Sequence, residues 1–460
     1  MSLLSEFLAL TQPWREVFPQ QRTYQRAVRQ ALGSLVCLGR RCLSRILWAS
    51  GRQDRSWSGE YFLHSRCQWQ PQQLFRPLLE RALHYCPQRL VGVALDDTRL
   101  RKTGRSIPQA FYQRDPMSPP FHVNLTLGLR FLQASLLLPL HRNAEMGARA
   151  IPVRFEEVSR DKRPGRKATQ QMKQEYRAAV KQQNLSTRFV EMGQQLRAEF
   201  DQAGGQDKLL VLAGDGSFCN RTCFRQIPER SVLLVRARKD AKLCLRAPAD
   251  SRRFYARDKF TPEQVRQQDN SHPWKTTKIF YGGQRRKVRY KVLATVYWQS
   301  GARQMPLRLI VVAPTAYRKS KSKRLYYRDP AYLLTSDLRS AVKQLLQIYF
   351  DRWQIEVNHR EEKDTLGVGQ AQLWNVTAVP KQPVLAVAAY SALLLAGLKA
   401  FGPQRGPAYA ALPKWRRNAR RPSCLDLVTL LRKEMAEQPD LLAPFGFEIS
   451  TKTLVQSACA

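Results

Sequence analysis

The stretch that decides the fold class is YFDRWQIEVNHREEK, which runs from Tyr349 to Lys363. Read as a helix at about 100° per residue, it gathers four polar side chains into a sector of roughly 60°: Tyr349, Arg352, Glu356 and Lys363. Apolar residues flank this stripe on both sides, so the stripe should point inward. Buried charges are costly unless they are paired or bind a metal. The stretch therefore predicts either a structural ion pair between Arg352 and Glu356 at i,i+4 or a functional site.

Two earlier segments place carboxylates at the end of a predicted strand. The apolar run Leu90 to Leu95 is followed by Asp96 and Asp97, and the run Leu209 to Ala213 is followed by Gly214 and Asp215. Apolar runs of this length predict buried strands, so these aspartates are expected at the strand exits. Each has a plainer alternative, because Asp-Gly-Ser is a common turn and Asp-Asp-Thr can begin a helix. Together with Glu356, they favour one shared carboxylate site.

Asp96 and Asp97 are adjacent in the chain and therefore point to opposite faces of a strand. Only one of them can enter the site. Asp96 and Asp215 share the form Asp-x-Thr/Ser, since Thr98 and Ser217 follow two residues later. This pattern favours Asp96 and keeps Asp97 as the alternative.

Three segments resemble the motifs of the DDE transposases of the IS4-like superfamily, and in detail its IS701-like branch. They are Asp96-Asp-Thr98 with Lys102-Thr-Gly104, then Gly214 to Asn220, and Arg352 to Gln370. The resemblance spans roughly residues 88 to 400. It implies an α/β fold, with an RNase H-like catalytic core that carries a β-rich insertion. An N-terminal helical domain is expected beside this core.

The resemblance also implies the roles of the site residues. Asp96, Asp215 and Glu356 would hold two Mg²⁺ ions, for which Mn²⁺ can substitute, because hard cations prefer oxygen ligands. Asp97 stays in the catalytic set as the alternative to Asp96. The residues implied to contact DNA are Tyr349, Arg352, Lys363, Lys102 and a tryptophan of the insertion, assigned to Trp298 with Trp274 left open.

The charge of the chain indicates a polyanionic partner. Lys and Arg number 77 against 36 Asp and Glu, which gives a formal net charge of +41 over 460 residues. The basic residues are spread along the chain, so a large positive field surrounds the whole protein. A merely solvated basic surface is the alternative. We expect double-stranded DNA as the partner.

The chain divides into five predicted parts. Residues 1–88 are helical and form either a DNA-binding domain or a cap on the core. Residues 89–238 and 304–400 are the two parts of the core, and Gln171 to Phe200 should be helical with a break near Asn184. Residues 239–303 are the β-rich insertion, whose aromatic and basic residues either bind DNA or form a small core. Residues 401–460 are a helical tail that dimerises the protein or contacts DNA.

Membrane and zinc-binding classes are disfavoured. The apolar stretch Val384 to Leu398 is shorter than the roughly 20 residues that a bilayer requires, so it predicts a buried helix. Met1 to Trp14 lacks the pattern of a secretory signal. The nine cysteines contain no Cys-x-x-Cys pair, which favours free thiols in a reducing compartment. We expect a cytoplasmic bacterial protein associated with the nucleoid.

These observations predict an insertion-sequence transposase that binds terminal inverted repeats, cuts the ends and joins them to target DNA. The resemblance implies a homodimer in the synapsed state. Two alternatives stay open. One is a nuclease of the same fold that does not join strands, and the other is a domesticated DNA-binding protein with a relict site.

Overall fold

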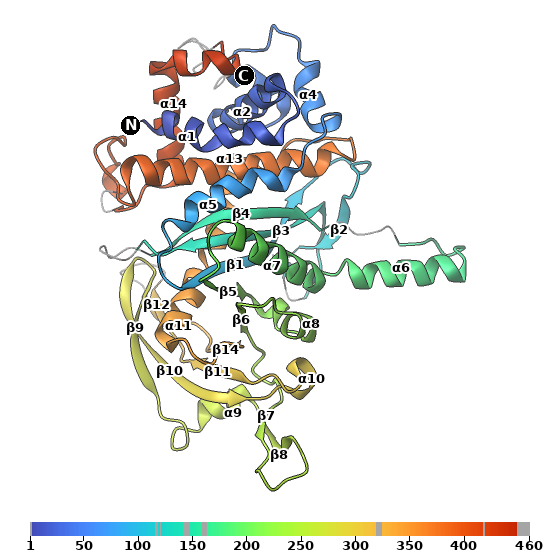
Figure 1. The fold of residues 1–460 in the computed structure, drawn as a ribbon, viewed down its shortest axis with the longest axis vertical. Helices are drawn as coiled ribbons and strands as arrows, with labels where there is room; N and C mark the ends of the chain where they lie inside the picture. The colour runs from blue at the N-terminus through green and yellow to red at the C-terminus, as the bar shows by residue number, and fades with distance from the viewer. Residues whose placement is uncertain are drawn as a thin grey trace.

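The computed structural model describes residues 2–448 apart from 116–117, 120, 141–146, 159–162, 319–323 and 417–418. A large mixed sheet crosses the middle of the molecule, with a helical layer above it (Figure 1). The N-terminal helices belong to this layer: α1 (Leu3–Thr11), α2 (Gln21–Val36), α3 (Leu43–Ala49), α4 (Ser58–Ser65) and α5 (Arg76–Leu83).

The central sheet follows the strand order β2-β3-β1-β5-β6-β14-β11-β10-β9, and β4 also pairs with β3. Strand β1 is parallel to β5 and β5 is parallel to β6, whereas the other pairs are antiparallel. The strands are β1 (Leu90–Arg101), β2 (Phe111–Arg114), β3 (Leu125–Leu138), β4 (Arg149–Glu157), β5 (Leu209–Gly214), β6 (Ser231–Arg236), β9 (Lys275–Tyr281), β10 (Gln284–Val296), β11 (Leu307–Val312) and β14 (Ala331–Thr335). The chain is therefore a mixed α/β protein.

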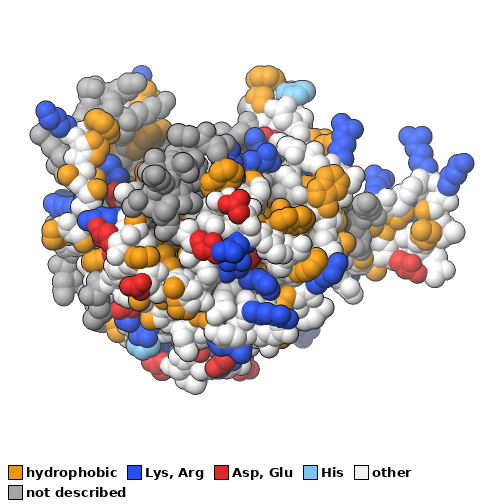
Figure 2. Space-filling model, turned by 90° about the horizontal axis from the view of Figure 1, so that it is seen from above, with side chains coloured by type: hydrophobic (Ala, Val, Ile, Leu, Met, Phe, Trp, Pro, Cys, Tyr) orange, Lys and Arg blue, Asp and Glu red, His pale blue; other side chains and the backbone are white. Residues whose placement is uncertain are grey.

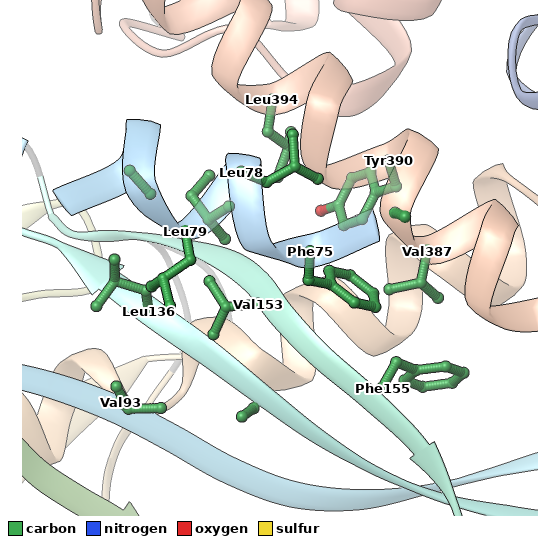
Figure 3. Close-up of a cluster of buried hydrophobic side chains, with 14 of the residues drawn as sticks. Phe75, Leu78, Leu79, Val93, Leu136, Val153, Phe155, Val387, Tyr390 and Leu394 are labelled. Atoms are coloured by element: carbon green, nitrogen blue, oxygen red, sulfur yellow. The ribbon is translucent and has the colours of Figure 1, made fainter. Parts of the chain in front are cut away.

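Alternation along the strands gives the sheet two buried faces. In β5, Leu210 and Leu212 join the larger core, whereas Val211 joins a smaller core with Leu345 and Leu346. The larger core lies under α5, α7 (Leu185–Gln202) and α13 (Ala378–Phe401), and the smaller one under α11 (Val342–Asp351). Figure 3 shows side chains of α5 and α13 packed over Leu136 and Val153 of the sheet. Each fully buried side chain of this kind stabilises the fold by about 1.5–3 kcal/mol.

The N-terminal helices share one layer with the C-terminal helices α13 and α14 (Cys424–Glu437), and we call this layer the helical cap. Glu6 of α1 pairs with Lys399 of α13 at 2.5 Å, and the Leu4 backbone N–H donates to the Glu434 carboxylate of α14 at 2.7 Å. Residues 1–88 and the described part of 401–460 therefore pack together rather than as separate units. For residues 1–88, both alternatives, a DNA-binding domain and a cap on the core, remain predictions.

The expected insertion, residues 239–303, is not separate from the central sheet. Strand β10 pairs with β11, where Tyr290 lies opposite Val312, and β9 pairs with β10. The described parts of the chain add two small hairpins, β7 (Leu243–Arg246) with β8 (Tyr255–Phe260), and β12 (Ala316–Arg318) with β13 (Leu325–Tyr327). Backbone pairing thus extends the core sheet through the insertion, which the local sequence did not indicate.

Helix α13 is the one candidate membrane span among the described residues, by length and composition. It has 24 residues, more than the predicted stretch Val384 to Leu398, and 83% of its most apolar window is buried inside the protein. The burial agrees with the expected core helix. The described cysteines form no disulfide.

Candidate active site

Asp96 and Asp215 come together through the pairing of two parallel strands. In the register of β1 with β5, Ala94 lies opposite Ala213, so Asp96 and Asp215 follow at the same level two residues later. Strand β5 ends at Gly214, as predicted. Strand β1 instead continues to Arg101, because β3 pairs with it as far as that residue. The prediction that β1 ends at the aspartates is therefore wrong.

The two neighbouring aspartates face opposite sides of the sheet. Asp96 shares a face with Ala94, whose side chain packs in a cluster with Ile355. Asp97 points the other way, and its Oδ2 accepts a hydrogen bond from Arg130 Nε at 2.8 Å. Asp96 is thus the aspartate that faces Glu356.

Asp215 begins a short turn. Its carboxylate accepts hydrogen bonds from the backbone N–H of Ser217 at 2.9 Å and from the Ser217 hydroxyl at 3.2 Å. The same carboxylate caps the short helix Gly216–Phe218. The turn expected for Asp-Gly-Ser is therefore present, and it holds the carboxylate beside Asp96.

Glu356 lies on α12 (Gln354–Arg360), which follows α11 after a tight turn at Arg352 and Trp353. There the backbone N–H of Ile355 bonds to the Arg352 carbonyl and that of Glu356 to the Trp353 carbonyl, the i→i−3 pattern of a 3₁₀ turn. The predicted helix from Tyr349 to Lys363 is thus interrupted once. It then widens, because Glu361–Thr365 form a π-helical turn.

Asn358 fixes α12 to the rest of the fold. Its Nδ2 donates to the Ala150 carbonyl of β4 and to the Tyr390 hydroxyl of α13, and its Oδ1 accepts from the Ser135 hydroxyl. All three partners are buried. Because each hydrogen-bonding group of the amide is satisfied, this buried residue sets the position of α12 over the sheet.

Arg352 lies between two of the candidate carboxylates. Its Nη1 is 4.0 Å from Asp96 Oδ2, and its Nη2 is 3.4 Å from Glu356 Oε1. The Nε and Nη1 atoms of this guanidinium are buried and have no hydrogen-bond partner among the described residues. The expected i,i+4 ion pair therefore exists, and the same arginine also reaches Asp96.

The carboxylates of the site act on one another electrostatically. Burial raises the pKa of Asp96 to about 7, Arg352 opposes this shift, and Asp215 adds to it. Burial also raises the pKa of Glu356, again against Arg352 and with a contribution from Asp215. Carboxyl groups with raised pKa values that share one buried place are typical of functional sites.

The donor types suit a hard divalent cation. Three carboxylates offer oxygen ligands, which Mg²⁺ and Mn²⁺ prefer. Among the described residues, however, no group of three Asp, Glu, His or Cys side chains is close enough together to hold a metal ion. Arg352 occupies the position of a counter-ion between Asp96 and Glu356. The residue types therefore fit the metal chemically.

A family comparison assigns the chain. The model of the DDE superfamily endonucleases matches residues 13–305, which include Asp96, Asp97 and Asp215. The chain belongs to this DDE superfamily. It is accordingly a nuclease-type enzyme that acts on DNA. No curated protein matches it.

An open groove of about 1430 Å³ runs beside the site of this DDE endonuclease. Tyr349 and Arg352 line it, as does Tyr281, one of the aromatic residues of the expected insertion. It is also lined by residues that were not predicted as DNA contacts: Arg236, Arg328, Arg421, Tyr317 and Tyr327. Burial raises the pKa of Tyr349, which stays neutral. Cations interspersed with aromatic rings suit a nucleic-acid strand. These added arginines lie far apart in the sequence, so only the fold brings them to one groove.

The remaining predicted DNA contacts lie in different surroundings. Lys102 is buried, and its Nζ donates to the carbonyl oxygens of Gly369 and Ala371 at 2.7 Å, so it fastens that loop. Trp298 packs edge-on against Phe224. Trp274 donates its Nε1–H to Asp269 and lies beneath Lys291. Lys363 is partly exposed on the π-helical turn.

His359 is buried between α12 and the core. Burial, together with the charges of Lys363 and Arg352, lowers its pKa to about 3, so the ring is neutral at pH 7. Its Nε2 has no hydrogen-bond partner among the described residues. The residue therefore packs in the interior.

Proposed function

We propose that this DDE endonuclease is an insertion-sequence transposase of the IS4-like superfamily and its IS701-like branch. It binds terminal inverted repeats, cuts the DNA ends and transfers the strands to target DNA. The observation that carries this proposal is that Asp96, Asp215 and Glu356 lie near one another in a partly buried place, with Arg352 between two of them. Two strands and a helix that deliver these carboxylates support an RNase H-like core.

Asp96, Asp215 and Glu356 are the residues that hold two Mg²⁺ or Mn²⁺ ions in this proposal. Bound there, such ions activate the attacking water or 3′-hydroxyl and stabilise charge on the leaving oxygen. Asp97 holds Arg130 and stays outside the metal set. The Ser217 contacts keep the Asp215 carboxylate in place for its role.

Arg352 has two roles in the proposed reaction. In the protein without DNA, its guanidinium offsets the charge of Asp96 and Glu356. A DNA phosphate offers the same guanidinium a bidentate partner. When DNA enters the groove, Arg352 turns to the phosphate and leaves the carboxylates to the metal ions.

The groove and the overall charge support DNA as the substrate. Tyr349, Arg236 and Arg328 line the groove beside Arg352, and the chain carries a net charge of +41. In this proposal Lys363, on the π-helical turn, and Trp298, which packs against Phe224, are further DNA contacts. A synapsed homodimer would bring two such sites to the two transposon ends.

Cleavage of the element's own ends tests the proposal. A labelled fragment with one inverted repeat from the DNA that flanks the gene is incubated with wild type or Glu356→Gln, in Mg²⁺ or Mn²⁺. Gel shifts confirm that both proteins bind equally. We expect metal-dependent cuts at the repeat boundary by the wild type alone.

The other outcomes separate the alternatives. Equal binding without cuts by either protein would favour the relict DNA-binding protein. Cuts without joined products, when target DNA is supplied, would favour a nuclease that does not join strands. Cuts that persist in Glu356→Gln would overturn the assignment of the site.

A further inference from the structure

Helix α6 (Gln170–Gln182) stands apart from the rest of the fold. It extends from the body of the protein at the right of Figure 1, and none of its residues is buried. Thr169 caps its N-terminus by accepting a hydrogen bond from the Met172 backbone N–H. An isolated helix of this length is marginal in water, because most helical stability comes from packing. The helix is therefore suited to a partner outside the folded body.

Two stripes run side by side along α6. Met172, Tyr176 and Val180 are spaced at i, i+4 and i+8, and so are Lys173, Arg177 and Lys181. At about 100° per residue, each triplet covers a sector of roughly 80°, and the two sectors adjoin. Figure 2 shows this projection at the right with Lys and Arg side chains at its edge and hydrophobic side chains next to them. The helix therefore presents cations next to an apolar strip.

The base of α6 is tied to the Asp215 turn. Helix α7 follows directly, with Asn184 as its cap. Asn220, five residues after Asp215, donates through Nδ2 to the Ser186 hydroxyl at 2.8 Å and to the Ser217 carbonyl at 2.9 Å. Phe189 of α7 stacks on Phe218 at 4.3 Å between ring centroids. The base of α6 is thus anchored beside a carboxylate of the candidate active site.

Charge selects the partner. The described segment that leads into α6 adds Arg163, Arg166 and Lys167, all exposed, and Glu175 is the acidic residue within the helix. A second copy of a chain with net charge +41 would repel such an arm, whereas duplex DNA carries one negative charge per roughly 1.7 Å of its axis.

We propose that α6 and the segment Arg163–Lys167 form an arm that binds the phosphate backbone of duplex DNA next to the catalytic site. Lys173, Arg177 and Lys181 contact phosphates, and the apolar stripe lies against the sugar edge of the groove. The arm extends the DNA-binding surface beyond the groove that Tyr349 and Arg352 line. This inference rests on the proposed function, because it assumes that DNA reaches Asp215.

Salt-dependent binding tests the arm. The full-length protein is titrated into a fluorescent DNA duplex, without metal, over a range of salt concentrations, and anisotropy gives the Kd. The arm variant is Lys173→Ala/Arg177→Ala/Lys181→Ala, in which alanine retains helical propensity. The matched control, Arg22→Ala/Arg81→Ala/Lys433→Ala, removes three exposed charges from the helical cap. Circular dichroism and thermal melts verify that both variants fold.

We expect the slope of log K against log salt to shrink by about 2 to 3 in the arm variant, since each phosphate contact contributes about 0.9. The control should change the slope by less than about 1. Equal slopes in the arm and control variants would overturn the inference, as would an altered oligomeric state with unchanged DNA binding. In either case, metal-dependent cleavage by the wild type that Glu356→Gln abolishes would leave the proposed function intact. A wild type that binds no DNA would overturn both.

Discussion

The two faces of the central sheet are covered in different ways. One face carries the larger core beneath α5, α7 and the helical cap, and α13 contributes twenty buried residues there. The other face is covered by α11 and α12, with smaller apolar clusters and with Arg352 between Asp96 and Glu356. The first face contributes mainly to stability. The second face buries less apolar surface and carries charged groups that a substrate or metal can bind.

The difference shows most clearly at one dipeptide. Asp96 and Asp97 are chemically identical and adjacent, yet one faces α12 and the other pairs with Arg130. Successive side chains of a strand point to opposite faces of the sheet. A shift of one residue therefore places the same carboxylate in different surroundings.

The strongest test of this difference compares Asp96→Asn with Asp97→Asn. The loss of a metal-binding carboxylate removes several kcal/mol of transition-state stabilisation, so Asp96→Asn should slow cleavage by at least about 10³-fold. Asp97→Asn removes a partly exposed ion pair and should slow cleavage by less than about tenfold. Single-turnover cleavage of a labelled transposon end measures both. The opposite order would exchange the two assignments.

The capped face should govern stability. Leu393→Ala on α13 opens a cavity at a fully buried side chain and should lower the free energy of unfolding by about 2–5 kcal/mol. Met172→Ala on the exposed α6 should change it by less than about 0.5 kcal/mol. Urea denaturation followed by circular dichroism gives both values. Equal losses would mean that α6 packs against the protein in solution.

Glu362, a buried residue of the π-helical turn that follows α12, predicts a pH dependence of stability. Burial raises the pKa of Glu362 from 4.5 to about 8. The folded state then keeps a proton that the unfolded chain has lost, so this group lowers stability as pH rises from about 4.5 to about 8.

Glu362→Gln removes that loss and should stabilise the protein above pH 8 by a few kcal/mol at most, since one pKa unit is about 1.4 kcal/mol. Thermal melts at pH 5 and pH 8.5 provide the comparison, and the variant at pH 5 serves as its own control. A gain of the same size at both pH values would show that ionisation is not the cause.

The smallest expected effect concerns Arg352 and metal affinity. Arg352→Gln removes the internal counter-ion of Asp96 and Glu356, and the Mn²⁺ affinity of the DNA-free protein should rise by about five- to tenfold. Electron paramagnetic resonance of free Mn²⁺ measures this without reference to activity. Arg236→Gln, in the groove wall, is the matched control. Unchanged or weaker Mn²⁺ binding by Arg352→Gln would show that Arg352 is not the counter-ion of these carboxylates.

Much of the local structure was predictable. The strand before Asp215, the buried helix around Val384 to Leu398 and the break near Asn184 all follow from apolar runs or polar caps, and the structure contains them. Sequence alone did not reveal the arrangement where pairing partners are remote, and the predicted end of β1 was wrong for this reason. Strand β1 continues beyond Asp97 because β3 pairs with it, and the insertion joins the core sheet through β10 and β11.

The sequence by itself determined the residue types of the site, the i,i+4 pair of Arg352 with Glu356, and the large positive charge. These properties depend on composition and on helical spacing, which are local. Only the tertiary structure decided that Asp96 rather than Asp97 faces Glu356, that Arg352 reaches Asp96, and that Lys102 binds a loop. It also joined the N-terminal helices with α13 and α14 in one helical cap. These outcomes depend on strand register and on packing between distant segments, and neither is encoded in any short stretch of sequence.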